Sequence, residues 1–174
     1  MLVLGVICAA SLFAQASPAQ SPGTETDKWK PLRFLVGTWE AKTQGGSAGA
    51  AGNGTYMFRL ELRAHLLVRH AATAECKGPD DFDCEHGDIL YIYAESPGQP
   101  FKAIYFDNEG HVIHYTLSMP EDRKVVFLSD APRPGPQYRL SYELKDDVMS
   151  GRFEMHMPGR AEFTTYLEWS GKKR

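Results

Sequence analysis

The chain has 174 residues, 43% of them apolar and 24% charged, with 16 glycines and 11 prolines. This composition excludes a disordered or fibrous chain, and the length suits one globular domain. The 19 basic and 22 acidic side chains give a formal net charge of −3. This charge balance does not predict the broad basic surface that nucleic-acid binding requires. We therefore expect no nucleic-acid partner.

Residues 1–16 form an uncharged, mostly apolar run that ends in Ala14-Gln15-Ala16, the small-x-small pattern of a signal peptidase site. We predict a signal peptide cleaved after Ala16 and a periplasmic or secreted protein. The run is shorter than the ~20 residues that span a bilayer, so no stable membrane insertion is expected after cleavage. A lipid anchor at Cys8 is disfavoured because Ile7, which is not small, precedes it. Because the run lacks a positively charged start, a buried N-terminal helix is the alternative.

Residues 17–30 are rich in Ser, Pro and Thr and show no apolar period, which predicts a flexible linker. The folded domain is expected over 31–170, followed by a basic tail at 171–174. It opens on 31–36, where a proline at the first helical position and clustered apolar residues predict a single helical turn.

The rest of the domain alternates short runs of Val, Ile, Tyr, Phe and Thr with turn residues, which predicts an all-β fold. The expected strands are 37–43, 54–63, 65–75, 88–94, 101–107, 111–119, 124–130, 136–145, 148–157 and 161–169. Short turns between them favour an antiparallel meander, and about ten strands avoid exposed edges by closing into a barrel. The interior of such a barrel is wide enough for one small ligand.

Alternation along the strands predicts which side chains face inward. The clearest case is Tyr138, Leu140, Tyr142 and Leu144, which share one face opposite polar neighbours. The same alternation places inward Tyr56, Phe58, Leu60, Leu62, Phe153, Met155, Met157, Phe163, Thr165, Leu167 and Trp169. Segment 88–94 is apolar on both faces, so we expect its outer face to be covered, with a second subunit of a homodimer as the candidate cover.

Cys76 and Cys84 lie in a polar stretch and, in an oxidising compartment, are predicted to form a disulfide across a loop. A metal site of Cys76, Cys84 and His86 is the competing interpretation, but Cys-x7-Cys is not a zinc spacing and no second cysteine pair exists. The sequence therefore assigns no metal ligand. The Gly-rich stretch 45–54 lacks the features of a phosphate-binding loop and is predicted to be a flexible hairpin loop at the barrel mouth.

Among six histidines, His70 is the most interesting because it is predicted to share an inward face with Leu66 and Val68. A histidine satisfied by hydrogen bonds within the core is the alternative. Glu61 and Asp107 are acids that could pair with a histidine. No nucleophile motif is present, so no catalytic residue is assigned.

Aromatic and polar side chains on inward faces could line a cavity, although core packing explains most of them equally well. The candidate ligand-binding residues are Trp39, Phe58, His70, Tyr105, Tyr115 and Tyr142.

The segment Phe34-Leu35-Val36-Gly37-Thr38-Trp39 and the later Asp107-Asn108-Glu109-Gly110 turn resemble a lipocalin-like (calycin-like) family of bacterial secreted β-barrel proteins of unknown function. The chain is more distantly similar to nitrobindin-type haem-binding domains. The resemblance implies that Trp39 and the helical turn close one barrel end and that a small apolar or planar ligand fits the centre. The haem-binding family has an axial histidine near its C-terminus, whereas 161–169 has none and His156 lies on a polar face.

No cofactor is therefore predicted, and haem with His70 as its ligand is kept as an alternative. The favoured function is an exported β-barrel that binds or carries a small hydrophobic molecule, rather than an enzyme. The remaining alternatives are a small enzyme that uses His70 as its base and a solid interaction module.

Overall fold

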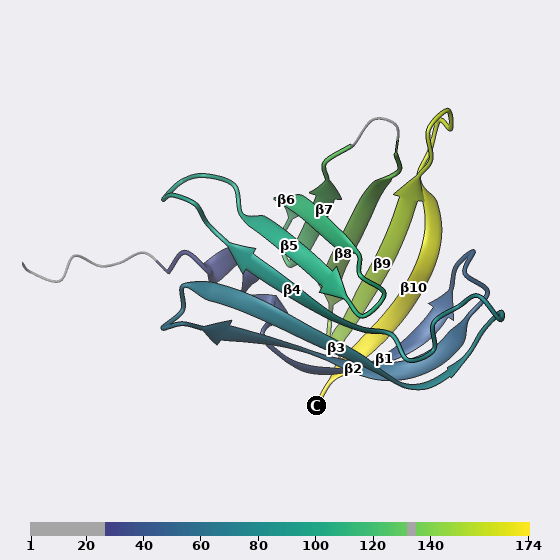
Figure 1. Ribbon diagram of the computed structural model, residues 1–174. Coiled ribbons are helices and arrows are strands. Elements are labelled where there is room, and N and C mark those ends of the chain that lie inside the picture. Colours follow the sequence, from purple (N-terminus) through teal and green to yellow (C-terminus); the bar gives the residue numbers. More distant parts are fainter. Residues whose placement is uncertain (1–26, 132–134) are drawn as a thin grey trace, which may run out of the picture.

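The structure, a computed structural model, describes residues 27–131 and 135–174. The predicted signal peptide, Cys8 and residues 17–26 of the predicted linker lie outside the described residues. The described chain begins with a short 3-10 helix, η1 (Lys30–Leu35), and continues as strands to its end (Figure 1).

The predicted all-β meander is confirmed, because the strands form one closed antiparallel barrel in which each pairs with its sequence neighbours and β1 pairs with β10 (Figure 1). The strands are β1 (Gly37–Gly45), β2 (Ala51–Glu61), β3 (Leu66–Lys77), β4 (Gly87–Tyr93), β5 (Lys102–Asp107), β6 (Val112–Glu121), β7 (Lys124–Ser129), β8 (Gln137–Lys145), β9 (Val148–His156) and β10 (Thr164–Lys173). Closure gives each described strand a hydrogen-bonded neighbour on both sides.

Two predicted segments differ from the structure. The Gly-rich stretch is only partly a loop, because β2 begins at Ala51 and pairs with β3 from there. Most of 171–174 is not a tail, because β10 continues to Lys173 and pairs with Trp39 of β1. In both places the backbone hydrogen bonds of a neighbouring strand compensate for residues of low strand propensity.

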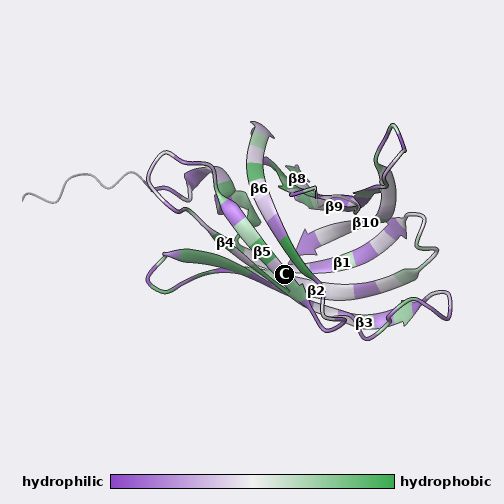
Figure 2. Ribbon diagram, turned by 45° about the horizontal axis from the view of Figure 1, so that its top comes forward, coloured by the Kyte–Doolittle hydropathy of each residue, from purple (hydrophilic) through white to green (hydrophobic). Residues whose placement is uncertain are grey.

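The inward alternation holds along β8, where Leu140 and Tyr142 are buried within the barrel. Hydrophobic and hydrophilic residues also alternate along strands such as β6 (Figure 2). Tyr142 lies at the centre of the interior, with its ring edge-on to Phe58 at 5.4 Å and to Phe127 at 6.3 Å. Such aromatic pairs add to the stabilisation that burial of their surface provides.

The predicted alternation of inward and outward side chains is wrong at the start of β10. The register shifts between Thr165 and Leu167, so Thr165 pairs with Glu154 on the outer face whereas Leu167 pairs with Phe153 on the inner one. Phe163, predicted inward, instead stacks outside the barrel under Arg139, 4.1 Å from its guanidinium carbon. A bulge of this kind changes which face the following residues occupy, and alternation alone does not reveal it.

Two further residues predicted inward lie beyond their strands. Leu62 follows β2 with φ of 48° and is 68% exposed. Met157 follows β9 and is 49% exposed. Both positions belong to turns, where the strand period no longer sets the direction of the side chain.

One end of the barrel is closed by η1 and the two tryptophans beside it. Leu32 and Leu35 of η1 are fully buried. Trp39 donates a hydrogen bond from Nε1 to the carbonyl of Leu35 at 2.8 Å, and Trp29 donates one to the carbonyl of Ala64, beyond β2, at 2.6 Å. These bonds fix the helical turn across the end of the barrel.

Burial raises the pKa of three core tyrosines, and it raises that of Tyr142 to about 12. Tyr56 and Tyr115 shift in the same direction for the same reason. The unfolded pKa of tyrosine is about 10. Because the pKa values of these tyrosines are higher in the folded protein, their stabilising contribution is fully present below about pH 10 and should be lost as pH rises above it.

We expect the free energy of unfolding, measured in urea, to decline above about pH 10. Tyr56→Phe should make this decline with pH less steep. Phenolate absorbance showing that these tyrosines ionise near pH 10 in the folded protein would contradict this.

Candidate functional site

A cavity of about 510 Å³ occupies the half of the barrel opposite η1. Its rim includes Phe82 in the β3–β4 connection and Glu109 in the β5–β6 connection. The η1 end, by contrast, is filled by residues such as Trp29 and Phe101, whose rings stack 5.1 Å apart. The interior is therefore packed solid at one end and hollow at the other.

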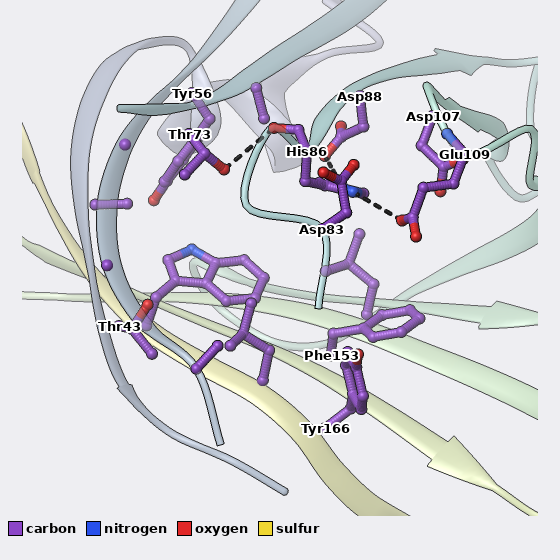
Figure 3. Close-up of a pocket in the computed structure, with 18 of the residues that line it drawn as sticks. Thr43, Tyr56, Thr73, Asp83, His86, Asp88, Asp107, Glu109, Phe153 and Tyr166 are labelled. Atoms are coloured by element: carbon purple, nitrogen blue, oxygen red, sulfur yellow. Dashed lines mark hydrogen bonds and ion pairs between the residues drawn. The ribbon is translucent and has the colours of Figure 1, made fainter. Parts of the chain in front are cut away.

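The cavity has one mainly apolar wall, formed by β8, β9 and β10. Leu140, Phe153, Met155 and Leu167 line it. Tyr166, displaced by the β10 bulge, lines it as well and packs edge-on against Phe153 at 6.2 Å. Figure 3 shows Phe153 and Tyr166 across the pocket from Asp83, His86 and Glu109.

The opposite wall carries a buried ion pair between Arg69 of β3 and Asp88 of β4, whose side chains are only 5% and 7% exposed. The Arg69 guanidinium donates hydrogen bonds to the carboxylate of Asp88 and to the hydroxyl of Tyr142. Burial opposes both charges, but Arg69 and His86 hold the pKa of Asp88 below its usual range, and Asp88 raises the pKa of Arg69. Both residues are therefore charged at neutral pH.

His86 lies between this ion pair and the rim of the cavity. Its Nε2 is 3.1 Å from the hydroxyl of Tyr105 and 3.6 Å from Asp88 Oδ2. Its Nδ1 is 3.2 Å from Glu109 Oε2. The Asp88 carboxylate, opposed by burial and assisted by Glu109, raises the pKa of His86. Contacts of both ring nitrogens with neighbouring side chains thus orient the imidazole ring of His86 (Figure 3).

The loops that carry the rim are joined by Asn108. Its side chain accepts a hydrogen bond from the amide of Gly87 at 2.9 Å and donates one to Asp83 Oδ2 at 3.0 Å. Asp107 accepts hydrogen bonds from the backbone of Glu109 and His111, and its carboxylate lies 2.9 Å from His111 Nδ1. Burial would raise the pKa of Asp107, but these bonds to His111 lower it overall.

The predicted disulfide is present between Cys76 at the end of β3 and Cys84 in the connection to β4, with Cα atoms 5.3 Å apart. It closes the loop that contains Asp83. The disulfide therefore restrains one side of the cavity rim.

The structure brings only part of the predicted ligand-binding set to the cavity. Tyr105 and Tyr115 line it. Trp39, Phe58 and Tyr142 are buried in the packed core and are not among its lining residues. Of the two acids expected to pair with histidine, Asp107 pairs with His111, whereas Glu61 pairs with Arg59.

The prediction that His70 faces the interior of the barrel is wrong. His70 is exposed on the outer face, between Met57 of β2 and Ile89 of β4, and its neighbour Arg69 faces the interior. The strand has apolar residues on both faces, and Val68 on the outer face is only 1% exposed, so periodicity favoured the wrong side. The alternatives that need His70 inside the barrel, as haem ligand or as base, are therefore not retained.

Sequence reasoning missed Arg69 and Asp88 and considered His86 only as a partner of the cysteines. The available signal was a charged residue within each of two apolar strands. A charge in such a position needs a buried partner of opposite sign. Arg69 and Asp88 satisfy each other across the neighbouring strands β3 and β4.

The outer face of β4 was predicted to be covered. Tyr91 is half-buried there and packs edge-on against Phe106 of β5, with ring centroids 6.2 Å apart. Phe106 itself is 40% exposed. Neighbouring side chains thus cover part of this face, and the homodimer stays a prediction.

Within the described residues, no helix has the length and apolar character needed to cross a membrane. A scan against protein-family models and a search of curated proteins found no match to the chain. The resemblance to lipocalin-like barrels therefore remains a prediction, and the fold assigned to the chain is a ten-stranded closed antiparallel β-barrel.

Proposed function

We propose that the protein is an exported β-barrel, similar to lipocalin-like carriers, that binds a small and largely hydrophobic molecule in its cavity. The observation that carries the proposal is the interior space of about 510 Å³ with one apolar wall and one wall of fixed polar groups. Sites for small molecules are typically about 300–1,000 Å³, mainly apolar, and equipped with a few oriented polar groups.

The two walls suggest how a ligand is held. Its apolar part would contact Phe153 and Leu167, and removal of that surface from water provides most of the affinity. Its polar group would meet Tyr105 and His86, whose positions are fixed by hydrogen bonds before the ligand arrives. Arg69 is neutralised by Asp88, so the wall favours a neutral polar group over a carboxylate.

Export is supported by two features of the chain. The uncharged run of residues 1–16 has the pattern of a signal peptide. The disulfide between Cys76 and Cys84 suits an oxidising compartment. A carrier of hydrophobic molecules in the periplasm or outside the cell is consistent with both.

The test is a titration with N-phenyl-1-naphthylamine, a neutral probe whose fluorescence rises in apolar surroundings. We expect saturable binding at one site. Ala71→Phe should weaken it by at least about tenfold, because Ala71 lines the cavity and the larger ring would occupy space the probe needs. Ala74→Phe is the matched control, since Ala74 is exposed on the same strand. Circular dichroism checks that both variants fold. Absence of binding, or equal binding by both variants, would refute the proposal.

A further inference from the structure

The rim of the cavity gathers side chains that are suited to a metal ion. One ligand atom from each of Asp83, His86 and Glu109 lies within 4.8 Å of the other two. Glu109 also belongs to a second such group, with Asp107 and His111. Three protein ligands that converge from two different loops are the minimum from which a catalytic-type zinc site is built.

His86 is oriented as metal-bound histidines are. Its Nδ1 points to Glu109, while its Nε2 is held by Tyr105 and Asp88, neither of which belongs to the group of three. In metal sites the far nitrogen of the ligand histidine is characteristically fixed by a carboxylate or another polar group, which orients the ring. Here Arg69 fixes that carboxylate in turn.

The group is also organised by contacts that lie outside it. Asn108 ties the loop of Asp83 to the loop of Glu109, and the disulfide at Cys84 anchors the residue next to Asp83. The ligands are thereby positioned by the fold, and little conformational entropy remains to be lost when an ion binds.

Charge balance at the rim favours a cation. Arg69, a cation within the polar wall of the cavity, is paired with Asp88. In the described part of the chain, the cationic partners of Glu109 and Asp107 are histidines alone, His86 and His111. The carboxylates therefore converge without the lysine or arginine that usually accompanies such a group.

We propose that Asp83, His86 and Glu109 bind a divalent transition-metal ion of the Zn²⁺ class at the mouth of the cavity. An imidazole ligand favours such an ion over Mg²⁺ or Ca²⁺, which prefer oxygen ligands alone. Three protein ligands leave at least one coordination position for water or another small group. The metal site shares His86 with the polar wall of the proposed carrier cavity, but binding of the ion does not require the hydrophobic ligand.

The test uses the full mature chain with its disulfide intact, stripped with EDTA and titrated with Zn²⁺ in competition with a chromogenic chelator. We expect one equivalent to bind. His86→Ala should weaken binding by at least about tenfold, whereas His114→Ala, which removes an exposed histidine of β6 outside the group, should leave it unchanged. Equal affinities of the two variants, or equal competition by Ca²⁺, would overturn the proposal.

Two further measurements keep the result unambiguous. Asp83→Asn alters a residue that the second group does not share and should also weaken Zn²⁺ binding, so the test holds even if His86→Ala fails to fold. The naphthylamine titration is repeated in EDTA. Retained probe binding in a protein that binds no Zn²⁺ would refute the metal site alone, and Zn²⁺ binding without probe binding would refute only the carrier function.

Discussion

Replacing Asp88 with alanine should lower the free energy of unfolding by about 3–5 kcal/mol, because it leaves the guanidinium of Arg69 buried without its counter-charge. Arg69 is only 4% exposed, and its remaining side-chain hydrogen-bond partner is the neutral hydroxyl of Tyr142. Urea unfolding followed by tryptophan fluorescence measures the loss. This change is among the largest expected for any single polar side chain of the barrel.

The matched control is the double variant Arg69→Met with Asp88→Ala, which removes both charges. It should recover much of the stability that Asp88→Ala loses, since paired removal of a buried ion pair is far less costly than removal of one partner. A loss below about 1 kcal/mol for Asp88→Ala, the range of exposed ion pairs, would show that water reaches Arg69 and that the polar wall is not the fixed arrangement described.

Replacing Trp39 with alanine should cost about 3–5 kcal/mol as well, for a different reason. Trp39 is 1% exposed, stacks on Tyr56 with ring centroids 6.4 Å apart, and holds η1 through the carbonyl of Leu35. Its loss leaves a large void and releases the closed end of the barrel. Equilibrium unfolding in urea measures the cost.

Two comparisons divide the effect of Trp39 into its parts. Trp39→Phe keeps an aromatic ring and should cost less than the alanine variant, with about 1 kcal/mol of its loss due to the missing hydrogen bond. Met119→Ala, at an apolar side chain that is 38% exposed, should stay within about 0.5 kcal/mol of the original protein. If Trp39→Ala lowered the free energy of unfolding as little as Met119→Ala, the packed end of the barrel would not stabilise the fold.

The barrel could be predicted because its strands can be recognised from local sequence patterns. Tyr138, Leu140, Tyr142 and Leu144 alternate with polar residues, and only one face of such a strand can be buried. Short turns then restrict pairing to sequence neighbours. These two rules require no knowledge of distant contacts, so they suffice for the architecture.

The candidate site could not be predicted in the same way because it depends on contacts between strands. Arg69 looks like an outward-facing charge until Asp88 of the next strand is placed beside it. Tyr166 enters the cavity only because of a bulge, and His86 meets Glu109 only because two loops converge. In each case the partner lies more than fifteen residues away or the local period is broken.

The meander makes every strand pairing local in sequence except that of β1 with β10, where Trp39 faces Lys173. A chain that loses its final strand would still form hairpins, but β1 and β9 would each offer a free row of backbone donors and acceptors. Such rows recruit strands from other molecules. C-terminal truncation is thus expected to make copies of the shortened chain associate with one another through these two strands.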